Sequence, residues 1–239
     1  MKRLTPSFHE KIWGATHLEP WFRNSDKKIG EVWFEASPLL VKFLFTSDKL
    51  SVQVHPHGKT EMWHVLAASP GAKIAAGFRE PISRDRLKEA ALSGEVEHLL
   101  QWFDAAPGDT FFLPAGTVHA IGAGLTLCEI QQSGGVTYRL FDYGRGRELH
   151  LDEALAVSDL GPHAARRQSR EGILVSCEYF LVEHLRLGGS AIQLPACDRN
   201  QVFIVIEGLI AGEVWSLPAG ASAVLSDGTA QVLRAVDNS

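Results

Sequence analysis

The sequence predicts a mainly β protein made of two β-barrel or sandwich units, with a short helical insertion in the first unit. Three observations lead to this fold class. Short runs of β-branched and aromatic residues recur along most of the chain and are separated by Gly, Pro, Ser or Asp. One stretch near residues 83–103 has helical spacing instead. A strand, a Leu-Pro-Ala-Gly turn and a second strand occur once in each half of the chain.

The strand-like segments share alternating or continuous apolar character and turn residues at their ends. They are LLVKFLFT (39–46), LSVQVHP (50–56), MWHVLAA (62–68), AKIAAGF (72–78), TFFLPAG (110–116), GLTLCEIQQ (124–132), TYRLFDY (137–143), ILVSCEYFLVEHLRL (173–187) and QVFIVIEGL (201–209). This density of strands is typical of a sandwich or barrel.

The helical insertion, ISRDRLKEAALSGEVEHLLQWF, begins after a possible N-cap at Ser83 and is divided by Gly94, which predicts a short helical pair. A second helical candidate, ELHLDEALAVSDLG, closes the first unit. Gly161 and Pro162, followed by HAARRQSREG, predict a linker, so that the expected domains are residues 1–160 and 161–239.

The Leu-Pro-Ala-Gly turn occurs in both units, but only the first copy is followed by a histidine. PGDTFFLPAGTVHAIGAG in the first is echoed by GEVWSLPAGASAVLSDG in the second, which lacks a histidine after its turn. Only the first unit is therefore expected to carry a polar site. The second unit ends soon after its turn, so a missing hairpin is expected to come from the N-terminal segment or a partner chain, unless the barrel is simply small.

Composition excludes several classes of protein. The 239 residues include 45% hydrophobic residues, carry a net charge of −5 and contain no long basic block, so we expect no nucleic-acid surface. We find no apolar run long enough for a membrane span and no leader pattern at the start. The three cysteines, Cys128, Cys177 and Cys197, lack metal-type spacing and suit a reducing compartment. A cytoplasmic protein is expected.

The segment QVHPHGKTEMWHVL (53–66) concentrates polar side chains between two predicted strands. Its GKT does not complete a phosphate-binding loop, because no glycine stands at the required earlier position and no long helix follows. Gln53 and His55 are two residues apart in a strand and so emerge on the same face. A tight turn then returns the chain, which brings Glu61 close to His55.

A fourth polar residue comes from another strand. His119 follows the Leu-Pro-Ala-Gly turn, a position from which β-barrels direct side chains into their mouth. Gln53, His55, Glu61 and His119 therefore form a candidate site for a divalent metal, either zinc or non-haem iron. Taken singly, each residue also fits an ordinary hydrogen-bonded role. His64 lies on the opposite strand face from Glu61, and His57 lies in the turn, within reach of solvent or substrate.

Several ordered motifs resemble the class I mannose-6-phosphate isomerases, especially their compact bacterial form. They are KIWGATHLEPWF, IGEVWFEASPLLVKFLF, LSVQVHP, GKTEMWHVL, LPAGTVHAIG, CEIQQSGGVTYRLFDYGR and CEYFLVEHLRL. The resemblance implies two cupin-type jelly-roll barrels, with one zinc ion per chain in the first barrel. It implies Gln53, His55, Glu61 and His119 as the zinc ligands, which are the residues chosen from spacing.

The resemblance also implies an activity and a substrate site. The activity is the interconversion of mannose 6-phosphate and fructose 6-phosphate through an enediolate, by a monomer or homodimer. The implied catalytic residues are Arg139, Lys59 and Glu129, and Ser51, Lys59, Arg139 and Arg145 are the implied substrate-binding residues. Glu129, Lys59 and His57 remain alternatives for the proton-transfer base.

Each of these residues has a simpler interpretation. Arg139 fits a surface arginine paired with Asp142, Lys59 a solvated turn lysine, Glu129 a structural carboxylate and Ser51 a strand hydroxyl. Between VHP and GKTE the chain has only His57, where the compact family has an acidic loop. Two other functions remain open: a sugar-phosphate-binding protein without turnover, and an iron-dependent cupin oxygenase.

Overall fold

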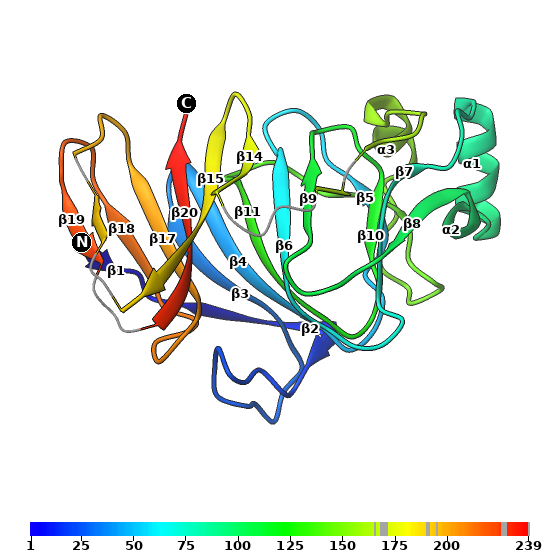
Figure 1. Cartoon of the computed structure of the whole chain (residues 1–239). Helices are drawn as coiled ribbons and strands as arrows, with labels where there is room; N and C mark the ends of the chain where they lie inside the picture. The colour runs from blue at the N-terminus through cyan, green and yellow to red at the C-terminus, as the bar shows by residue number, and fades with distance from the viewer. Residues whose placement is uncertain (165, 168–171, 190–191, 195, 226–228, 239) are drawn as a thin grey trace.

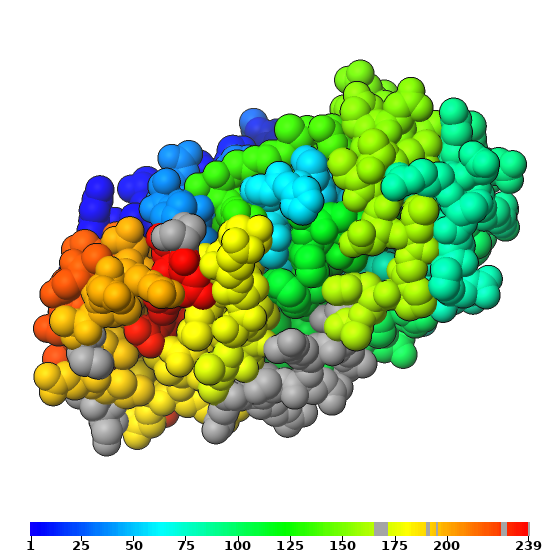
Figure 2. Space-filling view, turned by 90° about the horizontal axis from the view of Figure 1, so that it is seen from above, coloured from blue at the N-terminus to red at the C-terminus, as the bar shows by residue number. Residues whose placement is uncertain are grey.

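The computed structural model describes residues 1–164, 166–167, 172–189, 192–194, 196–225 and 229–238. Antiparallel sheets stacked in layers form most of the molecule, with the helices at one end and the C-terminal strands at the other (Figure 1). The space-filling view shows the same separation of the helical and C-terminal ends (Figure 2). The predicted mainly β fold is confirmed.

Three larger sheets and a two-stranded ladder make up the layers. In spatial order, the five-stranded sheet contains β12 (Tyr138–Phe141), β5 (Val52–Val54), β10 (His119–Ile121), β7 (Lys73–Phe78) and β8 (Leu100–Asp104). The seven-stranded sheet contains β13 (Arg166–Arg167), β9 (Thr110–Leu113), β6 (Glu61–Ala68), β11 (Leu125–Gln132), β4 (Leu39–Thr46), β2 (Ser7–Ala15) and β3 (Ile29–Ala36). The six-stranded sheet contains β1 (Lys2–Arg3), β18 (Val214–Leu217), β17 (Gln201–Glu207), β20 (Thr229–Asp237), β15 (Phe180–Gly188) and β14 (Gly172–Ser176). The ladder contains β16 (Ile192–Leu194) and β19 (Ala223–Leu225).

Four apolar clusters fill the spaces between these layers. One lies between the five- and seven-stranded sheets and includes Trp63 and Ile74. A second joins the seven- and six-stranded sheets, where Phe43 and Val182 belong to the same cluster. A third lies between the five-stranded sheet and the helices, and a fourth lies under the two-stranded ladder. Because side chains alternate along β4, Val41 and Phe43 enter the second cluster while Leu40 and Lys42 line a cavity on the other face of the strand.

The helices form where the spacing predicts them. Helix α1 (Arg84–Ser93) begins after Ser83, whose side chain accepts a hydrogen bond from the backbone N–H of Arg86, and ends at Gly94 with φ +85°. Helix α2 (Val96–Leu99) follows, and α3 (Leu151–Val157) occupies the second helical candidate. The predicted insertion extended to residue 103, but residues from Leu100 onward form β8. None of the helices in the described residues is long and apolar enough to cross a membrane.

One further difference and one expected alternative concern the second half of the chain. The segment 173–187 is two strands, β14 and β15, joined by a tight turn rather than one long strand. The N-terminal segment supplies a strand to the C-terminal sheet, since β1 pairs with β18 and Lys2 lies opposite Ser216. Of the linker predicted after Pro162, residues 165 and 168–171 lie outside the described residues.

Candidate active site

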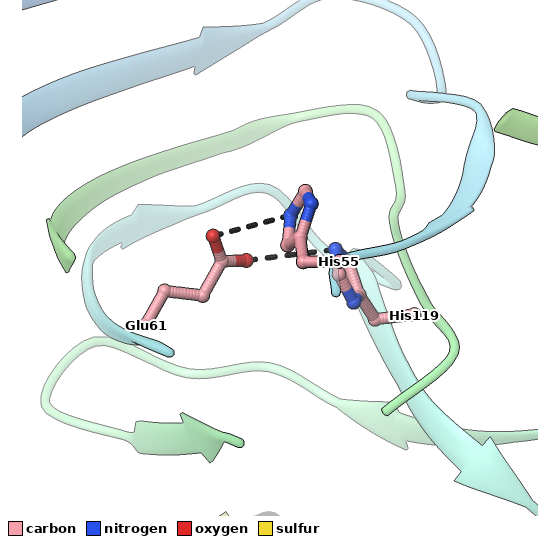
Figure 3. Close-up of side chains that lie close together, drawn as sticks. All are labelled: His55, Glu61 and His119. Atoms are coloured by element: carbon pink, nitrogen blue, oxygen red, sulfur yellow. Dashed lines mark ion pairs between the residues drawn. The ribbon is translucent and has the colours of Figure 1, made fainter. Parts of the chain in front are cut away.

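The four proposed metal ligands come from three neighbouring strands. Strands β5 and β10 pair antiparallel with His119 opposite Gln53, which brings the two distant motifs side by side. His55 follows β5, a short turn reverses the chain, and Glu61 begins β6. Figure 3 shows His55, Glu61 and His119 pointing toward one another. The structure thus brings together the residues that sequence spacing selected.

The hydrogen bonds of both imidazoles fix their tautomers. Nδ1 of His55 lies 3.1 Å from the carbonyl oxygen of Val136, and Nδ1 of His119 lies 2.8 Å from the carbonyl oxygen of Thr117. A carbonyl oxygen only accepts, so each Nδ1 carries the proton and each Nε2 keeps a lone pair. The two Nε2 atoms face Glu61, at 3.3 Å from Oε2 for His55 and 3.5 Å from Oε1 for His119.

Burial and charge prepare this group for a cation. The three side chains are at most 2% exposed, and neither carboxylate oxygen of Glu61 has a hydrogen-bond partner among the described residues. Burial alone raises the pKa of Glu61, but His55, Lys59 and His119 together bring it below its usual range. Burial lowers the pKa of His119 to about 3.

One carboxylate and two neutral imidazoles therefore converge, with ligand atoms within 4.8 Å of one another. A buried, unsatisfied carboxylate is costly unless a cation or a donor meets it. The nitrogen and oxygen donors of these three residues fit a divalent transition metal ion.

Gln53 is half-buried beside His119 and Ser51. Its Nε2 lies 3.3 Å from Nε2 of His119, and its Oε1 accepts a hydrogen bond of 3.1 Å from the Ser51 hydroxyl. Because a hydroxyl both donates and accepts, rotating the amide by 180° keeps the bond to Ser51. That rotation turns Oε1 toward the metal-binding group, as a fourth ligand requires.

Lys59 is buried beside the same histidine and is not a solvated turn residue. Its Nζ lies 3.1 Å from Nε2 of His55, 3.1 Å from the hydroxyl oxygen of Thr137 and 3.9 Å from Oε2 of Glu61. Burial lowers the pKa of Lys59, although Glu61 opposes this. Lys59 is thus a cation in contact with the candidate metal centre.

Glu129 belongs to a buried network that the sequence analysis did not include. Its Oε1 accepts a hydrogen bond of 2.7 Å from Lys42, and its Oε2 accepts one of 2.8 Å from the indole N–H of Trp63. Lys42 also donates to Gln131 at 2.6 Å. Burial alone lowers the pKa of Lys42, but Glu129 and Glu31 together raise it above its usual range. The available signal was a single lysine within the apolar strand LLVKFLFT.

A cavity of about 380 Å³ is lined by most of these groups, while His119 lies behind Glu61 and His55 and is not among the lining residues. The predicted residues that line it are Ser51, Gln53, His55, Lys59, Glu61, Glu129 and Arg139. Residues that the sequence analysis missed also line it, among them Lys42, Trp63, Gln131 and Arg147. On one wall Lys11 forms an ion pair of 3.2 Å with Glu31, and Trp33 donates to the same carboxylate at 2.9 Å. The cavity is therefore polar, cationic and partly aromatic.

Three arginines near the cavity have different roles. Arg139 lines the cavity, donates to the carbonyl oxygen of Glu148 at 2.6 Å and has a buried Nε without a hydrogen-bond partner among the described residues. Burial and the nearby charge of Arg147 lower the pKa of Arg139. Asp142 is bound by Arg145, at 2.8 Å, and by Arg147, rather than by Arg139. Arg145, a predicted substrate-binding residue, is not among the residues that line the cavity, and it also donates to the carbonyl oxygen of Lys49.

The other histidines lie outside this site. His57 is exposed in the turn and does not line the cavity. His64 is buried on the opposite face of β6, as parity predicts, with its ring centroid 5.7 Å from that of His184.

Comparison with known proteins identifies similar chains. No protein-family model matches the sequence. A mannose-6-phosphate isomerase of Streptococcus mutans is 38% identical over 203 residues, which cover 75% of this chain and 64% of that protein. The chain thus spans just under two thirds of that relative. The mannose-6-phosphate isomerase ManA of Bacillus subtilis is 31% identical over 275 residues, with 87% of both chains covered.

The fold agrees with these similarities. The crystal structure of a mannose 6-phosphate isomerase from Bacillus subtilis superposes with a TM-score of 0.86 at 27% identity and covers 98% of both chains.

Proposed function

The chain belongs to the class I mannose-6-phosphate isomerase family, and from this membership we propose that it interconverts mannose 6-phosphate and fructose 6-phosphate. The observation that carries the proposal is the convergence of His55, Glu61 and His119 beside a cavity that several lysine and arginine side chains line. A sugar phosphate needs this combination, because its oxygens bind a metal and its phosphate binds cations.

We propose one zinc ion per chain, held by Gln53, His55, Glu61 and His119. Nitrogen from two histidines and oxygen from a glutamate and an amide form a donor set that zinc accepts. When bound, the ion supplies Lewis-acid stabilisation of the negative charge that develops on the sugar oxygens.

The isomerisation moves one carbon-bound proton and one hydroxyl proton. The C2 proton of the open-chain aldose ends on C1, the hydroxyl proton of O2 ends on O1, and the intermediate is an enediolate. We assign the transfer of the carbon-bound proton to Lys59. Burial lowers the pKa of its amine, so that the uncharged form, which can accept a proton, is more populated near pH 7 than for a solvated lysine. Glu129 is assigned the hydroxyl proton. Each of its oxygens accepts one hydrogen bond from the protein and retains another lone pair for a sugar hydroxyl.

The phosphate is assigned to Arg139 and Arg147. Both line the cavity, and burial together with the nearby charge of Arg147 lowers the pKa of Arg139, as expected for two neighbouring guanidinium groups. Two like charges held together favour a dianion between them. Ser51 keeps the amide of Gln53 in place, and Arg145 adds positive charge from behind Asp142.

We further propose that the protein works in the cytoplasm as a monomer or homodimer. The three cysteines are free thiols, which suits a reducing compartment. Sedimentation velocity on the purified protein decides between the two oligomeric states.

The activity is tested by measuring fructose 6-phosphate formed from mannose 6-phosphate, on protein treated with chelator and then reloaded with zinc. We expect turnover that needs zinc, is lost in His119→Ala and persists in His64→Gln. His64 is an equally buried histidine on the other face of β6 and therefore serves as the control.

Absence of turnover from folded, zinc-loaded protein overturns the proposal. Sugar-phosphate binding without turnover then identifies a non-catalytic binding protein. Oxygen consumption by iron-loaded protein identifies an oxygenase.

A further inference from the structure

The loop between β11 and β12 crosses the rim of the cavity. We call residues 133–137 the rim loop; Gly134, Gly135 and Thr137 line the cavity. Its first end is tied to the turn between β3 and β4 of the seven-stranded sheet, where the backbone N–H of Ser133 donates to the carbonyl oxygen of Pro38 at 2.7 Å. Its second end continues into β12, where Tyr138 pairs with Val54, the residue before His55. The rim loop thus joins the two sheets beside a proposed metal ligand.

The two metal-site histidines are oriented in different ways. The acceptor for Nδ1 of His119 is the carbonyl of Thr117, two residues away in the same turn. The acceptor for Nδ1 of His55 is the carbonyl of Val136, 81 residues away on the rim loop. The orientation of His119 is therefore local, while that of His55 depends on where the rim loop lies.

Lys59 is held by the same loop. The hydroxyl of Thr137 accepts a hydrogen bond of 3.1 Å from Nζ of Lys59. The Cα of Gly135 lies against the stem of Lys59, because a Cβ added there would come within 2.6 Å of the lysine Cβ. Gly135 also has φ +82°, which a residue with a side chain rarely adopts. Only glycine allows the loop to approach this closely.

The short turn after His55 contributes to this contact. A Cβ on Gly135 would also come within 3.4 Å of the carbonyl oxygen of Gly58, so the rim loop packs on the turn that contains only His57 between Pro56 and Gly58. The shortened turn and the glycine loop therefore form one contact surface.

We infer that the rim loop is a positioning element for the metal site, in which the Val136 carbonyl sets the tautomer of His55 and Thr137 seats Lys59. Val136 acts through the ring of His55, and Thr137 acts through the amine of Lys59. The inference rests on the proposed metal site and adds that the rim loop controls the affinity of this site for the metal ion.

The first test measures the dissociation constant of Zn²⁺ for the full chain by competition with a chromogenic chelator. Gly135→Ala pushes the loop away from Lys59 and takes the Val136 carbonyl with it, so we expect binding weakened by about 10- to 100-fold. The control is Gly108→Ala, because Gly108 has φ +88° but nothing within 4 Å of an added Cβ. It imposes the same backbone strain without the displacement, and its Zn²⁺ affinity should equal that of the unmodified chain.

Equal Zn²⁺ affinity of folded Gly135→Ala and the unmodified chain overturns the inference, as does absence of Zn²⁺ binding by the unmodified chain. A loss of affinity in Gly108→Ala as large as that in Gly135→Ala assigns the effect to backbone strain and also overturns it. Circular dichroism of each variant verifies folding. If Gly135→Ala does not fold, the tautomer of His55 is determined by ¹⁵N NMR of its ring in the zinc-free, unmodified chain. A proton on Nδ1 supports the inference, and a proton on Nε2 overturns it.

The second test separates Lys59 from the metal. Thr137→Val removes the acceptor for Lys59, and Thr137→Ser keeps it. We expect a lower kcat with unchanged Zn²⁺ affinity in the valine variant and recovery of kcat in the serine variant. Equal kcat in both variants overturns the role of Thr137.

The Zn²⁺ titration does not require turnover. A chain that binds Zn²⁺ in a Gly135-dependent way and leaves mannose 6-phosphate unchanged supports the inference while overturning the proposed function.

Discussion

Glu129 is held in a buried ion pair and also has a proposed role in proton transfer. The carboxylate is buried, and Lys42 and Trp63 occupy one lone pair on each oxygen. Removing one partner of a buried ion pair leaves the other charge without compensation, which costs about 3 to 5 kcal/mol. We therefore expect Glu129→Gln to lower both the free energy of unfolding and the isomerase rate, as measured by urea denaturation and the coupled assay.

A second variant separates the two effects. Lys42→Met combined with Glu129→Gln removes both charges, so most of the lost stability should return while the activity does not. Full activity in the double variant contradicts the catalytic assignment of Glu129.

At the scale of residues, the sequence indicated the metal ligands better than the rest of the cavity. Gln53, His55 and Glu61 are close in the chain, so strand alternation and one turn sufficed to group them. Lys42 was missed because the cavity that it faces is formed by distant segments. The sequence also could not identify which arginine pairs with Asp142. Arg139, Arg145 and Arg147 all lie within five positions of it, and the structure pairs it with Arg145 and Arg147.

The caps of α1 give a prediction at the scale of the element. The hydroxyl of Ser83 accepts a hydrogen bond from the backbone N–H of Arg86, and Ser83 lies outside the cavity. Loss of an N-cap costs about 1 kcal/mol, so Ser83→Ala should lower Tm by roughly 2 to 4 °C in a chain of this size without changing kcat. Differential scanning calorimetry measures the shift. Ser93→Ala, in the last turn of the same helix, is the matched control and should change Tm less.

The face of β6 that points away from the metal site gives a pH dependence. Burial and His184 lower the pKa of His64 to about 4, while an unfolded histidine titrates near 6.5. The unfolded chain therefore takes up the proton first as the pH falls, and the stability present above pH 6.5 is lost toward pH 4. The loss is on the order of 2 kcal/mol between pH 7.5 and pH 5.

His64→Gln removes this titration and keeps a polar partner for Thr110, which lies 3.0 Å from Nδ1 of His64. Urea denaturation at both pH values should show a smaller pH dependence in the variant than in the unmodified chain. Identical pH dependence in both contradicts the assignment.

At the scale of elements, strands with strong patterns were predicted and short or paired ones were not. LLVKFLFT corresponds to β4 at both ends, because most of its residues are apolar and its neighbours are turn residues. The segment 173–187 has no Gly or Pro at its centre, so nothing in the sequence signalled the turn between β14 and β15. Strand β1 is only two residues long and exists because β18 offers an edge.

At the scale of the molecule, one apolar cluster contains residues from both halves. Phe43 and Ile130 from the seven-stranded sheet belong to the same buried cluster as Val182 and Ile204 from the six-stranded sheet. The division at residue 160, predicted from Gly161 and Pro162, stays a prediction. We expect a single unfolding transition with equal calorimetric and van't Hoff enthalpies, because neither sheet keeps its apolar face covered alone. Two separated transitions contradict this.

The order of strands in the sheets could not be predicted from the sequence. Pairings such as β5 with β10 and β12 join segments far apart in the chain, and local patterns carry no information on which edges meet. Family resemblance supplied the overall architecture, but the pairing of β1 with β18 was only one of three alternatives.

That pairing sets an order of events during synthesis. Lys2 and Ser216 are 214 positions apart, so at ordinary rates of translation β1 is made about 10 to 40 s before its partner strand exists. The C-terminal sheet therefore receives its edge strand from a segment that was made much earlier than the rest of the sheet. A fusion partner attached before Met1 would be carried on this sheet, beside the C-terminal strands rather than beside the candidate metal site.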